Sequence, residues 1–269
     1  MAAFEFKAGG HGIARFVYLF NYPEGVSVSD GEAWYLGEHV PQVKKLTGIL
    51  RYRSWRALPP IPMPSPDPYD RFVRMSELAF ENMVACRQAT LANLRLWTPS
   101  SKGVPGFGEL ECVILDEEPQ YDLLRDVPAE QYKYMALPLK YSGGAPELED
   151  TEDTIIDVYM FNYGVPIADG EDWYLGHHVR EGKLVKQVGV THYQTWKTIR
   201  VPQEPNSPLR PNRFYRLTEL GLPASAKEWP KEGGPPRPRL LFTMSQLGNV
   251  LGDWRNIVID PEQVRDLLK

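Results

Sequence analysis

The chain repeats itself over nearly its whole length, and this repeat restricts the possible folds more than any other feature. The string WYLGEHV, residues 34–40, returns as WYLGHHV, residues 173–179, with Glu38 against His177 as the one difference. Four further matches are VYLFNY with VYMFNY, YRSW with YQTW, RFVRMSEL with RFYRLTEL, and VILDEEPQYDLL with IVIDPEQVRDLL, at offsets of 141 to 144 residues. We therefore predict a tandem duplication, with one domain at residues 1–132 and a second at 133–269.

Each copy is predicted to form strand, helix, strand, strand, helix and strand. The predicted strands cover residues 14–22, 49–55, 71–78 and 109–116 in the first copy and 155–163, 190–196, 213–220 and 256–260 in the second. The first helix carries the WYLG string, with Asp30 or Asp169 as its expected N-cap, and the second helix covers residues 81–97 or 239–254. This order is that of a ferredoxin-like α+β domain with both helices on one face of an antiparallel sheet. Because the other face is bare and apolar, we expect the two sheets to pack face to face as an α+β barrel.

Composition limits the partners. The net charge of −5 is spread along the chain, which disfavours nucleic acid as a partner. The two cysteines form no C-x-x-C pair, so neither a disulfide framework nor a zinc site is expected, and a reducing cytoplasm fits best. The sequence contains no signal-peptide pattern and no apolar run of about 18 residues, so no membrane partner is expected. Small molecules or proteins remain as partners, and a second copy of the chain in a homodimer is one of them.

The order of elements and the strings WYLGEHVP and WYLGHHVR resemble the dimeric α+β barrel superfamily, in particular its EthD-like and HapK-like members, whose helix reads WYLxxHVP. The resemblance implies the barrel fold. It also implies an enzyme that acts mostly without organic cofactors on aromatic or polyketide-like molecules, as an isomerase, cyclase, lyase or oxygenase, although some relatives bind haem. It further implies that the helix histidine, His39 or His178 here, faces the barrel cavity.

Histidine is the candidate acid–base residue. Its unperturbed pKa near 6.5 lets it take and give a proton near neutrality. On the predicted helix His39 borders the apolar stripe, so a half-buried structural role is the alternative for it. The second copy is richer in proton-transfer groups, and we expect one competent site near His178, with Tyr174 and His192 as further catalytic residues.

Tyrosines and arginines are the candidate binding residues. The first strands carry tyrosines along one face, and these either form plain core or stack on an aromatic ligand. The arginines of the first copy are expected to hold a carboxylate. A strand carboxylate, Glu77 or Glu219, either tunes the histidine or forms a salt bridge with an arginine such as Arg74 or Arg216. The expected substrate-binding residues are thus Tyr35, Arg51, Arg53, Tyr159, Tyr193 and Glu219.

No metal or other cofactor is predicted. His177 and His178 are adjacent, and adjacent helix residues point about 100° apart, so both cannot easily reach one ion. The sequence therefore favours a cofactor-independent enzyme, an isomerase, cyclase or lyase that uses His and Tyr on an aromatic or ring-cleavage-derived small molecule. A non-catalytic binding protein, and an oxygenase that is haem-dependent or cofactor-free, are the alternatives.

Overall fold

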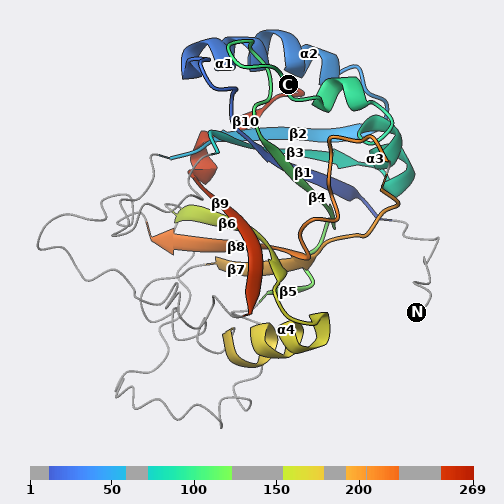
Figure 1. Cartoon of the computed structure of the whole chain (residues 1–269), viewed down its shortest axis with the longest axis vertical. Coiled ribbons are helices and arrows are strands. Elements are labelled where there is room, and N and C mark those ends of the chain that lie inside the picture. The colour runs from blue at the N-terminus through green and yellow to red at the C-terminus, as the bar shows by residue number, and fades with distance from the viewer. Residues whose placement is uncertain (1–11, 59–71, 123–153, 179–191, 204, 224–249) are drawn as a thin grey trace, which may run out of the picture.

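The computed structural model describes residues 12–58, 72–122, 154–178, 192–203, 205–223 and 250–269 (Figure 1). The first half contains β1 (Ala14–Phe20), α1 (Val28–Trp34), the π-helical turn η1 (Tyr35–His39), α2 (Val40–Val43), β2 (Ile49–Arg56), β3 (Arg74–Phe80), α3 (Met83–Ala89), the 3-10 helix η2 (Leu94–Trp97), β4 (Leu110–Asp116) and β5 (Tyr121–Asp122). The second half contains β6 (Thr154–Tyr163), α4 (Ile167–Trp173), the π-helical turn η4 (Tyr174–His178), β7 (His192–Lys197), β8 (Arg216–Pro223), β9 (Leu251–Ile259), the 3-10 helix η7 (Pro261–Gln263) and β10 (Arg265–Asp266).

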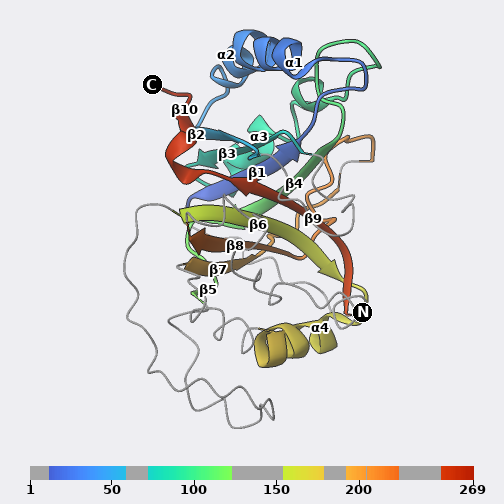
Figure 2. The same cartoon turned by 90° about the vertical axis from the view of Figure 1, so that its left-hand side faces the viewer.

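Two antiparallel five-stranded sheets form the molecule, in the orders β10-β2-β3-β1-β4 and β5-β7-β8-β6-β9. The sheets lie against each other, with α1, α2 and α3 outside the first and α4 outside the second (Figures 1 and 2). The α+β ferredoxin-like fold expected from the repeat is thus confirmed. The predicted boundary between residues 132 and 133 lies outside the described residues.

Alternation along the strands separates two cores. Val17 and Leu19 of β1 point toward the second sheet and pack with Val158 and Met160 of β6. Phe16 and Tyr18 point the other way and pack under the helices of the first half. The tyrosine-rich strand faces are therefore turned toward the helices, and the aliphatic faces fill the space between the sheets.

Each half adds a short strand to the sheet of the other half. β5 follows β4 but pairs with β7, and β10 follows β9 but pairs with β2. Two equivalent backbone hydrogen bonds join the sheets next to these arms, from Leu58 N to Val258 O at 2.8 Å and from Ile199 N to Ile114 O at 2.7 Å. The arms and these bonds close the two sheets into a barrel.

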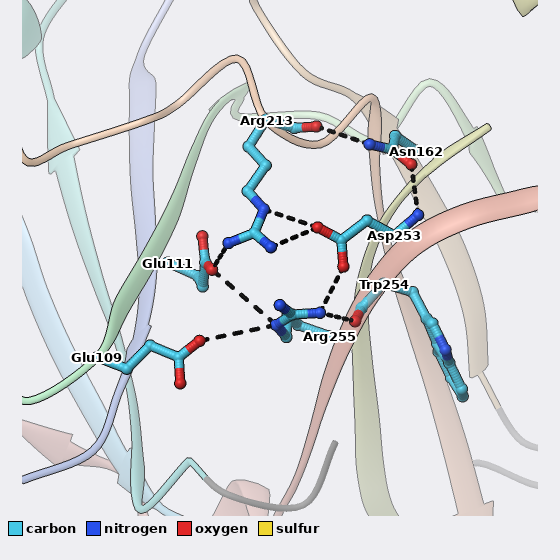
Figure 3. Close-up of polar contacts among 7 residues, drawn as sticks. All are labelled: Glu109, Glu111, Asn162, Arg213, Asp253, Trp254 and Arg255. Atoms are coloured by element: carbon cyan, nitrogen blue, oxygen red, sulfur yellow. Dashed lines mark hydrogen bonds and ion pairs between the residues drawn. The ribbon is translucent and has the colours of Figure 1, made fainter. Parts of the chain in front are cut away.

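A cluster of charged residues joins β4 and β9 to the segment that precedes β8 (Figure 3). Arg213 pairs with Glu111 and Asp253, and Arg255 pairs with Asp253 and lies 3.9 Å from Glu111. The Glu111 side chain is almost fully buried, so the arginines compensate a charge that water does not reach. The cluster ties the two halves together.

Three local predictions need correction. Ser27, not Asp30, caps α1: its hydroxyl accepts from the backbone N–H of Asp30, which lies in the first turn. The predicted helix 81–97 is split into α3 and η2. Of the predicted helix 239–254, residues 251–254 belong to β9, residue 250 is a turn, and the rest lies outside the described residues.

Candidate functional site

The repeated WYLG string forms a π-helical turn in both halves. In the first half the N–H of Val40 bonds to the carbonyl of Tyr35, a span of five residues. This wider turn brings Tyr35 and His39 into a stack, with ring centroids 5.5 Å apart at 23°. Tyr174 and His178 stack in the same way, at 5.5 Å and 26°. The string therefore positions a tyrosine–histidine pair, and π-turns of this kind occur frequently at functional sites.

Each π-turn tyrosine reaches a buried network on the outer face of its sheet. The hydroxyl of Tyr35 lies 2.8 Å from that of Ser76, and the hydroxyl of Tyr174 lies 2.8 Å from that of Thr218. A fully buried arginine lies beneath each tyrosine ring, Arg74 in the first half. The network is thus a repeated feature of both halves.

A helix carboxylate holds each of these arginines. In the second half Glu171 binds Arg216 through both oxygens at 2.7 Å and accepts a hydrogen bond from the hydroxyl of Tyr163 at 2.6 Å. Burial alone would raise the pKa of Glu171, but the hydrogen bonds from Arg216 and Tyr163 lower it to about 2. The carboxylate therefore stays ionised and fixes the helix on the sheet.

Aromatic rings enclose His39. The rings of Trp34, Tyr35, Trp97 and Phe107 have centroids 4.8 to 5.5 Å from the imidazole. The residue is 3% exposed, and its Nε2 has no hydrogen-bond partner among the residues that the structure describes. Burial lowers the pKa of His39 to about 3. This histidine lies on the helix side of the first sheet rather than in the barrel cavity.

His178 lies at the equivalent place in the second half. Its ring stacks on Trp173 at 5.1 Å and on Tyr174 at 5.5 Å, and burial lowers its pKa to about 4. It too faces the helix side of its sheet, which corrects the expectation that it faces the barrel cavity. His192 begins β7, but its side chain and that of His177 lie outside the described residues.

The two halves differ where the first strand meets the last. Asp157 takes the place of Phe16, and Asn256 takes the place of Cys112, in the same strand register. Both polar residues are buried, and within the described part of the chain Oδ1 of Asn256 has no hydrogen-bond partner. Neither residue was predicted as part of a site, although a break in an otherwise repeated strand pattern is visible in the sequence.

Asp157 changes the contacts of the neighbouring tyrosine. In the first half the hydroxyl of Tyr18 bonds to that of Tyr52 at 3.0 Å. In the second half the hydroxyl of Tyr159 donates to Asp157 at 2.6 Å, and burial, with the charge of Asp157 next, raises the pKa of Tyr159 well above its usual value. Trp254 stacks on Tyr159 at 6.0 Å. The second half thus holds an acid–tyrosine pair that the first half lacks.

The predicted site residues fall into two groups. Tyr159 and Tyr193 lie with Tyr174 and His178. Burial, then the electrostatic interaction with Tyr174 and a hydrogen bond to it, raise the pKa of Tyr193, and both of these tyrosines also act on Tyr159. In the first half the ring of Tyr35 stacks on that of His39. Arg51, Arg53 and Glu219 are not brought together with these residues, since they lie on the inner, sheet-to-sheet faces.

The expected partners of the strand carboxylates are also corrected. Glu77 bonds to Arg15 and, at 2.9 Å, to Arg51, not to Arg74 or Arg216. Arg15 also lies 3.7 Å from Glu219. Within the described ranges, no cluster of three or more His, Cys, Asp or Glu side chains could hold a metal ion.

Comparisons with known proteins agree with the fold. No family model and no curated protein matches the sequence. The solved structure of an anthrone oxidase-like protein matches 96% of this chain and 94% of its own, with a TM-score of 0.52 and 13% identity. A chlorite dismutase from Candidatus Nitrospira defluvii, in complex with imidazole, matches 94% and 93% with a TM-score of 0.45 and 11% identity. The first likeness shows a shared α+β ferredoxin-like fold. Among the helices that the structure describes, none is long and apolar enough to cross a membrane.

Proposed function

We propose that the chain is an enzyme that moves a proton on a small aromatic or conjugated molecule, bound on the helix side of the second sheet. The observation that carries the proposal is the presence of Asp157 and Asn256 where the first half has Phe16 and Cys112. Among the described residues, Oδ1 of the buried Asn256 has no hydrogen-bond partner, which costs about 1–3 kcal/mol. Because the first half builds the same sheet with apolar residues, folding does not require the polar pair, and a function in the second half accounts for it.

The arrangement suits proton transfer. The Tyr159 oxygen can accept a proton from the substrate while its own proton passes to Asp157 across the 2.6 Å hydrogen bond, and the reverse step returns it. Asn256 faces Tyr159 in the strand register, and we propose its side-chain amide as the donor to a developing enolate oxygen. With a pKa near 4, His178 is neutral at pH 7 and serves as an uncharged hydrogen-bond partner.

Several reactions begin with this step. Isomerisation, cyclisation and bond lysis continue from the enolate without a cofactor. In a cofactor-free oxygenation the same enolate would transfer electrons to O₂, and the anthrone oxidase-like protein of the same fold makes this the second candidate. Both candidates use the same residues for the first proton transfer.

Hydrogen–deuterium exchange tests the proposal. Phenols and enolisable aromatic ketones, anthrone among them, are incubated with the protein in D₂O, and exchange is followed by NMR while an electrode records O₂ uptake. We expect accelerated exchange for at least one compound, and a loss of about 100-fold or more in Asp157→Asn and Tyr159→Phe. O₂ uptake that matches turnover selects the oxygenase, and exchange without uptake selects the isomerase or lyase.

The first half supplies the matched control. Tyr18→Phe alters the equivalent tyrosine, where no carboxylate is bonded, and should leave exchange at the wild-type rate. Exchange that survives in both second-half variants would contradict the proposal. Saturable binding with no exchange in the wild type would indicate a binding protein instead.

A further inference from the structure

A cavity of about 270 Å³ lies between the two sheets at one end of the barrel. Its lining includes Arg15, Trp55, Glu77, Ile156 and Glu219, which all point to the inner faces of their strands, and Arg53. It is therefore on the opposite side of the second sheet from Asp157 and Tyr159. The function proposed above does not use it.

Comparison of the described parts of the two halves shows that Trp55 lacks an arginine that its counterpart Trp196 has. Trp55 pairs with Met75 in the first sheet, and Trp196 pairs with Leu217 at the equivalent position of the second. The guanidinium carbon of Arg15 lies 4.9 Å from the centroid of the Trp196 ring.

The residue that corresponds to Arg15 in the second half is Ile156. Each of the two lies across from the last strand of its own sheet, Arg15 from Leu115 and Ile156 from Ile259. An isoleucine side chain is short and carries no charge, so it cannot cover Trp55 as Arg15 covers Trp196. Trp55 and Ile156 both line the cavity instead.

Two carboxylates, Glu77 and Glu219, lie near Arg15, and their equivalence shows which one a cation over Trp55 would bind. Arg15 donates to Glu77 at 2.8 Å and lies 3.7 Å from Glu219. Glu77 and Glu219 are equivalent in register, across from Val17 and Val158. A cation over Trp55 would thus pair with Glu219 and lie near Glu77, and both carboxylates line the cavity.

We propose that this cavity binds a small guanidino acid, with its planar guanidinium stacked on Trp55 and paired with Glu219. A guanidinium fits because its plane stacks on an aromatic face and its N–H groups match a carboxylate. Arg53 lines the same cavity and is exposed, so it meets the ligand's other end and selects a carboxylate there. The proposed ligand would bind Trp55 in the way that the guanidinium of Arg15 packs on Trp196 within the chain.

Titration calorimetry of the full chain with 4-guanidinobutanoate tests the proposal. We expect one saturable site per chain and a loss of affinity of at least tenfold in Ile156→Arg, which supplies the missing guanidinium from the chain itself. Glu219→Gln should weaken binding by a similar factor, and it decides the matter if Ile156→Arg does not fold. Glu118→Gln, an exposed carboxylate outside the cavity lining, is the control and should bind as the wild type does.

A second probe tests the carboxylate. Agmatine keeps the guanidinium but ends in an amine, so it should bind more weakly than 4-guanidinobutanoate, and Arg53→Gln should reduce that difference. Equal binding of the two probes by the wild type would overturn the choice of a guanidino acid. Absence of saturable binding, or binding unaffected in both Ile156→Arg and Glu219→Gln, would overturn the site. Asp157→Asn should bind as the wild type does, which separates this site from the proposed active site.

Discussion

At the residue scale, burial among aromatic rings makes the stability of the fold depend on pH through the two helix histidines, His39 and His178. An unfolded chain protonates a histidine near pH 6.5, whereas the folded chain leaves His39 neutral down to about pH 3 and His178 down to about pH 4. The unfolded state therefore binds more protons as the pH falls below 6.5, and the folded state loses stability over that range. The carboxylates with lowered pKa values, such as Glu171, add their own losses only at lower pH.

His39→Leu should reduce this loss of stability. Between pH 7.5 and pH 5, each buried neutral histidine lowers the free energy of unfolding by about 2 kcal/mol. The leucine variant should lose about that much less than the wild type over the same range, as measured by urea unfolding at the two pH values. An identical pH dependence in both proteins would show that His39 is protonated in the folded state.

The sequence could predict that His39 borders the core, but not what encloses it. Leu36 and Val40 set the apolar stripe from within the helix, whereas Trp97 and Phe107 reach the imidazole from far along the chain. No local pattern reports such contacts. Asp157, in contrast, could have been found from the sequence, because aligning the two first strands shows an aspartate where the first half has Phe16.

At the element scale, two glycines of the first helix have opposite surroundings. A Cβ on Gly31 would lie 2.3 Å from the ring of Tyr22, whereas a Cβ on Gly37, inside the π-turn, would meet nothing within 4 Å. Gly170 repeats the first case against Tyr163, at 2.2 Å. Close packing against a tyrosine ring thus explains why residue 31 is a glycine. At residue 37 there is room for a larger side chain, so packing does not explain that glycine.

Gly31→Ala should destabilise the fold, since the added methyl group displaces Tyr22 from its hydrogen bond to Glu32. We expect a loss of about 2 kcal/mol in the free energy of unfolding, within the range for overpacked cores. Gly37→Ala is the matched control and should be neutral or slightly stabilising, because alanine is the better helix former. Equal losses in thermal unfolding of the two variants would contradict this account.

The long strands were predictable and the arms were not. Alternation and β-branched residues located β1 and β6 within one or two residues, and their repetition gave the sheet. β5 and β10 contain two residues each, too few to show any period. Alternation placed the strand tyrosines on a common face, but it did not say that this face would meet helices.

At the scale of the whole molecule, buried charges connect the halves. Arg213 of the second half bridges Glu111 of the first half and Asp253 (Figure 3). Removing one partner of a buried pair leaves the other uncompensated, which costs more than the pair contributes when intact.

Arg213→Met should therefore lower the free energy of unfolding by about 3 kcal/mol. Adding Glu111→Leu should recover part of this loss, because it removes a buried carboxylate that would otherwise keep only Arg255, at 3.9 Å. A double-mutant cycle by chemical unfolding measures the coupling. Additive losses would mean that Glu111 does not depend on Arg213.

The exchanged arms have a consequence for how copies of the chain behave together. β5 and β10 each leave one sheet to complete another, and nothing in their pairing distinguishes a sheet of the same molecule from that of a neighbour. We therefore expect that at high protein concentration, or after partial unfolding, the arms pair between chains and produce domain-swapped dimers.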